Sequence, residues 1–147
     1  MSDDPLSFRV LNEIGIIDQL ASAVFTAVLP RNISIAQFSV LNHFVRLEIE
    51  SQSPAELASA FQVSRPTMTN ILARLERSEL VSITPDPDDG RAKRVAITNI
   101  GRAMRQECLA RLEEPRAALE AKIPTELFEK LAPLLAELRS TMDTMRD

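Results

Sequence analysis

The sequence predicts a mainly α-helical protein with a single small β-hairpin. Across most of the 147 residues, apolar side chains recur every three or four positions, which is the spacing of one helix face. Glycine is scarce, with only 3 residues, and aromatic residues make up 4% of the chain. Between residues 81 and 98, apolar and polar residues instead alternate on both sides of a turn rich in Pro and Asp, as they do in a hairpin.

The first helix is expected to begin with Asp4 as its cap and Pro5 in its first position, and to end near Pro30. Its apolar residues form a heptad-like row. The row consists of Val10, Ile14, Ile17, Ala21, Val24 and Val28. Such a row can pack against the chain's own core or against a partner, and the sequence leaves both interpretations open.

Two further helix starts are marked by serine caps. Ser34 is expected to cap a second helix with an apolar stripe. That stripe consists of Phe38, Leu41, Val45 and Ile49. Ser53 and Glu56 form a capping box at the start of a short third helix, where Pro54 suits the first helical position.

The fourth helix is expected to start between Ser64 and Pro66, with either Ser64 or Arg65 as its cap. Its apolar stripe consists of Met68, Ile71, Leu72 and Leu75. The opposite face carries Pro66, Thr67, Asn70, Ala73, Arg74 and Arg77, with Thr69 on the flank. Hydroxyls, an amide and guanidiniums suit contact with phosphates and base edges, although an ordinary solvated face has the same composition.

The hairpin has a tip that is acidic on one side and basic on the other. Val81 and Ile83 precede the turn, and Val95 and Ile97 follow it. Asp89 lies two residues before Arg91, close enough for its carboxylate to orient the guanidinium. An Arg at such a tip suits a narrow, electronegative minor groove, whereas a surface ion pair without a partner is the simpler interpretation.

The segments VSRPTMTNILARLE, DPDDGR and AITNIG, in this order, resemble the MarR family of winged helix–turn–helix regulators. Asp89-Gly90-Arg91 matches that family's Asp-x-Arg wing motif, and Thr98 with Gly101 matches its Thr-x-x-Gly. The chain departs from the family pattern at Ser78-Glu79, where Lys/Arg-Gly is common, at Ile97, where Leu is commoner, and at Gly90, where a second arginine is frequent.

The resemblance implies a winged helix–turn–helix with a small two-stranded wing and long terminal dimerisation helices. Residues 1–33 would form the N-terminal dimerisation helix, residues 34–98 the DNA-binding domain, and residues 99–147 the C-terminal dimerisation helices. The expected DNA-binding residues are Ser64, Arg65, Pro66, Thr67, Thr69, Asn70, Arg74, Arg77, Asp89, Arg91, Lys93 and Arg94. A homodimer would read a pseudo-palindromic operator in double-stranded DNA.

The resemblance also implies a small aromatic or anionic effector that releases the DNA. Candidate ligand-binding residues are Phe25, Phe38, His43, Arg46, Met104 and Cys108, with Val24 beside them. Each also fits a structural role: His43 as a packed or surface histidine, and Cys108 as a buried, inert thiol and not a redox sensor.

The C-terminal part is expected to contain helices interrupted by proline. Thr98 can cap a long helix that Gly101 would allow to pack closely, with Ile100, Met104, Cys108 and Leu112 on one side. Pro115 should kink or interrupt it. A last helix from Pro124 and Thr125, with an expected kink at Pro133, has its own apolar row. This row consists of Leu127, Leu131, Leu134, Leu138 and Met142.

Composition and charge limit the classes of function that the chain can have. The net charge is −4, yet five cations and no acids lie between Gly90 and Gln106. No apolar run approaches 18 residues and no signal peptide is evident, so we expect a cytoplasmic protein without a membrane segment. With one His, one Cys and no phosphate-binding glycine loop, we expect no enzyme activity, metal or cofactor.

Two functions are therefore compatible with the sequence. The first is a DNA-binding transcriptional regulator, in this family most often a repressor. The alternative is a winged-helix protein-interaction module without DNA binding, which the net charge and the missing wing arginine favour and the cationic run opposes.

Overall fold

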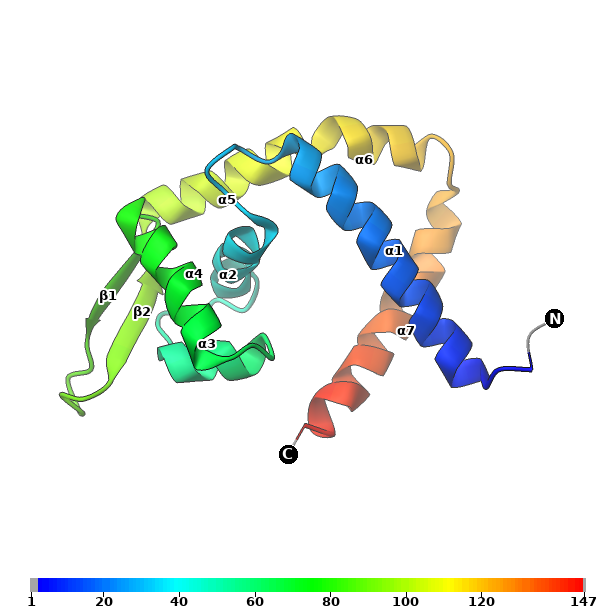
Figure 1. The fold of residues 1–147 in the computed structure, drawn as a ribbon. Helices are drawn as coiled ribbons and strands as arrows, with labels where there is room; N and C mark the ends of the chain where they lie inside the picture. The colour runs from blue at the N-terminus through cyan, green and yellow to red at the C-terminus, as the bar shows by residue number, and fades with distance from the viewer. Residues whose placement is uncertain (1–2, 147) are drawn as a thin grey trace. The chain divides into compact units, whose positions relative to one another are not determined.

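The computed structural model describes residues 3–146, which contain seven helices and one two-stranded sheet (Figure 1). The chain divides into two compact units, Met1–Arg111 and Leu112–Asp147. The first unit contains α1 (Leu6–Val28), α2 (Ile35–Arg46), α3 (Pro54–Ala60), α4 (Arg65–Arg77), β1 (Val81–Pro85), β2 (Lys93–Ile97) and α5 (Asn99–Arg111). The second contains α6 (Glu113–Glu120) and α7 (Thr125–Thr144). The mainly helical winged fold predicted from the sequence is confirmed.

Serine residues cap three helices of the first unit, α2, α3 and α4, as predicted. Ser34 and Ser53 each accept a hydrogen bond from the backbone N–H three residues later, and both form complete capping boxes. Ser64, not Arg65, caps α4. The predicted start of α1 is wrong by one residue, because Pro5 occupies the cap position and Leu6 is the first helical residue.

Three helices end in the same way, with a non-glycine residue in the left-handed conformation. Glu48, Gln62 and Glu79 follow α2, α3 and α4 with φ of 52°, 52° and 60°. After α4, the Leu80 N–H donates to the Leu75 carbonyl at 2.9 Å, and the Glu79 N–H donates to the Glu76 carbonyl at 2.9 Å. This pair of bonds is a Schellman motif, which satisfies carbonyls that the helix leaves without partners.

The hairpin forms in the predicted place. β1 pairs antiparallel with β2, with Ile83 opposite Val95. Val81 and Val95 are buried, whereas Ser82 and Thr84 are exposed, so the alternation seen in the sequence reflects one packed face. Gln52 adds a bridge on the other edge: its N–H donates to the Val95 carbonyl at 3.0 Å and its carbonyl accepts from the Val95 N–H at 2.8 Å.

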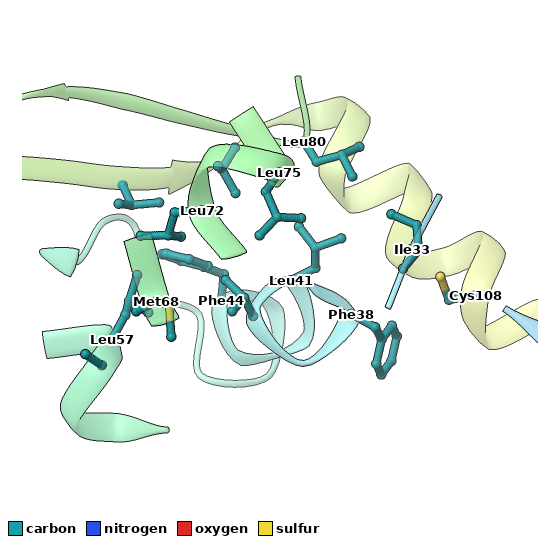
Figure 2. Packing of buried hydrophobic residues seen from close by; sticks show 14 of the residues in the cluster. Ile33, Phe38, Leu41, Phe44, Leu57, Met68, Leu72, Leu75, Leu80 and Cys108 are labelled. Atoms are coloured by element: carbon teal, nitrogen blue, oxygen red, sulfur yellow. The ribbon is translucent and has the colours of Figure 1, made fainter. Parts of the chain in front are cut away.

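One hydrophobic core joins α2, α3, α4, the hairpin and α5 (Figure 2). The predicted stripe of α4 is confirmed, since Met68, Leu72 and Leu75 are buried. Phe38 and Leu41 of the α2 stripe are buried as well. A buried stripe fixes the rotation of α4 about its axis and therefore determines which of its residues face outward.

α5 starts against the end of α4. Thr98 Oγ1 accepts from the Gly101 N–H at 2.9 Å and donates to the Glu79 carbonyl at 2.6 Å, so the predicted cap is confirmed. A Cβ on Gly101 would collide with the Leu80 carbonyl oxygen, which explains the glycine. Ile100, expected on the same side as Cys108, is instead 54% exposed.

Two of the three C-terminal prolines, Pro115 and Pro124, lie where the sequence predicted a helix to be interrupted and to begin. α5 ends at Arg111 and α6 begins at Glu113, so the long helix is interrupted just before Pro115. α7 runs unbroken through Pro133, where the kink stays a prediction. Within α6, Arg116 bonds to Glu113 and Glu120, and the contact with Arg116 lowers the pKa of Glu113.

The apolar rows of α1 and α7 have no buried residue among those that the structure describes. By length and mean hydropathy, α1 is long and apolar enough to cross a membrane, contrary to the expectation from the sequence that no segment is. Length and hydropathy alone are weak evidence for such a role, since buried helices of soluble proteins satisfy the same criteria.

Candidate nucleic-acid interface

The outer face of α4 presents polar side chains from a rigid support. Thr67, Asn70 and Arg74 are exposed, while Met68 and Leu72 on the opposite face are buried in the core. The remaining predicted residues of this helix, Arg65, Pro66, Thr69 and Arg77, are exposed as well. Every residue of the predicted set from α4 is therefore accessible, and all but Pro66 have side chains that can donate hydrogen bonds.

The first turn of α4 orders two hydroxyls. Ser64 Oγ accepts from the Thr67 N–H at 3.2 Å and donates to Thr67 Oγ1 at 2.8 Å. This arrangement leaves the Thr67 hydroxyl hydrogen available to a further acceptor. The N-terminus of a helix also attracts anions, so the turn suits a phosphate oxygen.

At the wing tip, Asp89 orients the backbone and not the guanidinium of Arg91. Asp89 Oδ1 accepts from the Arg91 N–H at 3.0 Å, and Asp86 Oδ1 accepts from the Asp88 N–H at 2.9 Å. Within residues 3–146, no ion pair joins Asp89 to Arg91. Arg91 is exposed at the end of a turn that its neighbours hold in shape.

The two basic residues that follow have different environments. Lys93 is exposed at the start of β2, as a phosphate contact requires. Arg94 is instead half-buried: its guanidinium donates to the Ser51 carbonyl at 2.7 Å and to Ser51 Oγ at 3.1 Å, and lies 3.8 Å from Glu56. These contacts join the wing to the segment between α2 and α3, and the phosphate contact expected of Arg94 stays a prediction.

The predicted ligand-binding residues have different environments in the structure. Phe25 and Phe38 pack edge to face with centroids 4.7 Å apart. His43 Nε2 hydrogen-bonds Gln52 Oε1 at 2.9 Å, and its ring lies 5.2 Å from Phe61. Met104 packs against the core, Cys108 is buried in it, and Arg46 is exposed. Burial raises the pKa of the Cys108 thiol.

A cavity of about 450 Å³ lies elsewhere in the first unit. It is lined by Arg31, Asn32, Ile33, Ser34, Gln37, Arg74, Arg77 and Ser78. Arg31 and Asn32 were not among the residues predicted from the sequence. Their only local signal is a cation and an amide just before the cap of α2, and nothing in the sequence places that link beside α4.

Comparisons with known proteins agree with this architecture. The sequence model of the MarR family matches residues 33–93, from the residue before the Ser34 cap to the start of β2. The homoprotocatechuate degradative operon repressor of Escherichia coli is 28% identical over 120 residues, covering 81% of this chain and 80% of that protein.

Solved structures resemble the chain over nearly its full length. The transcriptional regulator BldR from Sulfolobus solfataricus superposes with a TM-score of 0.73 at 26% identity, covering 93% of this chain and 99% of that one. A mutant of MarR from E. coli, solved in complex with operator DNA, gives a TM-score of 0.71 at 24% identity, covering 92% and 99%. The similarity to this MarR structure is a similarity of fold alone.

Proposed function

The chain belongs to the MarR family of transcriptional regulators, and from this premise we propose that it is a sequence-specific repressor that binds a pseudo-palindromic operator as a homodimer. MarR family regulators are non-enzymatic DNA-binding proteins, and the proposal includes neither a catalytic step nor a cofactor. It places the protein in the cytoplasm with its DNA. The observation that carries it is the exposed polar face of α4, held by a buried stripe on the other side.

In this proposal α4 enters the major groove. Asn70 and Arg74 are the base-reading residues, because an amide can bond adenine and a guanidinium can bond guanine in a bidentate manner. Thr67 and Thr69 contact bases or phosphates beside them. Ser64, Arg65, Pro66 and Arg77 approach the backbone, where phosphate contacts fix the register without reading the sequence.

The wing tip enters the adjacent minor groove. Arg91 is the inserted side chain, and Asp89 fixes the turn through the Arg91 backbone N–H at 3.0 Å. Lys93, at the start of the wing's return strand after Ala92, contacts a phosphate. A guanidinium is favoured in a narrow groove because the negative potential is enhanced there.

The exposed apolar rows of α1 and α7 support a homodimer. Ile17, Leu127 and Leu134 are among the exposed side chains of these rows, and a partner copy would remove them from water. A membrane is a poorer partner for α1, since Arg9, Glu13 and Asp18 lie within or near the apolar segment, and a charge at a bilayer centre costs about 2.5–3.5 kcal/mol.

Release by a small ligand completes the proposal. A ligand that prefers a spacing of the two α4 helices mismatched to the groove repeat would shift the population away from the DNA-binding state. Phe25, Phe38, His43, Arg46, Met104 and Cys108 stay candidate contacts only if the dimer opens a cleft beside them.

Binding to DNA across a salt series tests the proposal. We would titrate labelled DNA from upstream of the protein's own gene with wild-type protein and with Arg74→Ala, using unrelated duplex as the competitor. Arg111→Ala, in which an exposed arginine paired to Glu107 is lost, is the matched control. Preference for the upstream DNA and a steep loss of affinity with salt are expected, because phosphate contacts release counterions.

The alternative is a winged-helix protein-interaction module without DNA binding. The net charge of −4 and Gly90 at the position of a second wing arginine favour it. Under this alternative neither duplex binds at low salt, and Arg74→Ala behaves like Arg111→Ala. Equal binding to both duplexes would contradict sequence-specific repression and leave a non-specific DNA-binding role.

A further inference from the structure

The cavity between the link before α2 and the second half of α4 concentrates positive charge. Arg31 comes from the link, and Arg74 and Arg77 come from α4. Among the described residues, no carboxylate lines it. None of these three guanidiniums forms an ion pair with another residue in the range 3–146. Three like charges around one opening repel each other, which an anion between them would relieve.

The first turn of α2 adds neutral donors to the same cavity. Ser34 and Gln37, both lining residues, satisfy each other through the capping box, at 2.8 Å and 3.1 Å. Both residues lie at the positive end of a 12-residue helix, which favours an anion nearby. Gln37 is only 6% exposed, and its Oε1 accepts from the Ser34 N–H. Among the described residues no buried side-chain nitrogen or oxygen lacks a hydrogen-bond partner, so the unbonded Gln37 Nε2 is in contact with solvent and can donate to a ligand with acceptor oxygens.

We propose that this cavity binds a small polyvalent oxyanion, of the class of di- and tricarboxylates or phosphate esters. Its volume of about 450 Å³ exceeds that of one phosphate group and falls in the range of small-molecule sites. Ile33 is the single apolar lining residue among those that the structure describes, and the other lining residues all have polar or charged side chains. Three guanidiniums match a ligand with at least two negative charges, through charge-assisted hydrogen bonds.

Binding of this anion would compete with DNA, and this part of the inference rests on the proposed function. Arg74 and Arg77 belong both to the cavity and to the outer face of α4. An anion that holds these guanidiniums neutralises them and turns them away from phosphates and bases. Arg31 belongs to the cavity and lies outside the proposed DNA contacts, so it separates the two roles.

Calorimetry without DNA tests the cavity itself. Citrate and inorganic phosphate would be titrated into the full chain at constant ionic strength, with acetate as the monovalent comparison. We expect citrate to bind at least tenfold more tightly than acetate, and Arg31→Gln to weaken citrate at least tenfold. Arg102→Gln, an exposed arginine of α5 outside the cavity, should leave citrate binding unchanged. Equal binding of citrate to the wild type and Arg31→Gln, or no binding, would overturn the proposal.

A second measurement distinguishes a free anion from a DNA phosphate as the natural occupant. In the absence of citrate, Arg31→Gln should bind operator DNA within about threefold of the wild type, while citrate should no longer displace it. A loss of DNA affinity as large as that of Arg74→Gln would assign the cavity to a backbone phosphate and overturn the free-anion proposal. If wild-type protein binds no DNA, the proposed function fails, and the calorimetry still decides the cavity.

Discussion

Gly101 allows α5 to pack against the end of α4 because it has no Cβ. Its Cα lies against the Leu80 carbonyl, so an added Cβ would force α5 away from the end of α4. We expect Gly101→Ala to lower the free energy of unfolding by about 1–3 kcal/mol, as overpacked sites do. Urea denaturation measures this. Gly90→Ala is the control, because a Cβ there meets nothing within 4 Å; a similar loss in both variants would contradict the explanation.

At the wing tip, one guanidinium is expected to contribute to DNA affinity. Arg91→Ala should weaken operator binding and reduce the slope of log affinity against log salt by about 1, because one cation no longer displaces counterions. Its oligomeric state should not change, since the side chain is exposed on a turn. Fluorescence anisotropy across a salt series measures the affinity and its slope, and unaltered affinity would exclude the wing from the mechanism.

Cys108 is expected to be unreactive in the folded protein. It is fully buried, and burial raises the pKa of its thiol, so little thiolate forms near neutral pH. Ellman's reagent at a mildly alkaline pH should react slowly with native protein and completely in urea, where the same thiol is its own control. Fast reaction of the native protein would instead indicate a redox-sensitive site.

At the scale of the elements, the end of α4 has an unfavourable backbone conformation. Glu79 adopts a left-handed conformation, with φ of 60°, in a position that glycine usually occupies. Glu79→Gly should raise the free energy of unfolding by about 1 kcal/mol, since a Cβ in this conformation costs about 1–2 kcal/mol and glycine's extra chain entropy offsets part of it. Thermal unfolding measures the change. Glu76→Gly, within α4, should have the opposite sign, at about 1 kcal/mol.

Patterns between residues close in sequence predicted the helices and the hairpin well. The features that the sequence did not predict depend on contacts between residues far apart in the chain. The caps at Ser34 and Ser53 and the buried stripe of α4 depend on residues close together in the chain, so sequence spacing reveals them. The bond from Arg94 to Ser51 was not predicted, because the two residues are 43 positions apart and their contact leaves no local signal. The cavity likewise joins Arg31 to Arg74, and no periodicity encodes that meeting.

For the whole molecule, assembly is the property that the exposed apolar rows should control. Leu134 in α7 is 62% exposed, and Leu134→Glu would place a charge in the proposed dimer interface. We expect this variant to sediment as a monomer and to lose operator affinity. Leu47→Glu, at an exposed leucine outside α1 and α7, should stay dimeric. A Leu134→Glu variant that remains dimeric would exclude this part of α7 from the interface.

The wing is joined to a neighbouring segment through the middle of β2, as well as paired along its length. Gln52 bonds Val95 in both directions, and Arg94 holds Ser51, so the hairpin is joined to the segment between α2 and α3. If the protein binds its operator as proposed, the wing and α4 would contact one half-site together as a rigid unit. We would then expect tolerance for altered half-site spacing to depend on how the two copies are joined, and not on bending of the wing.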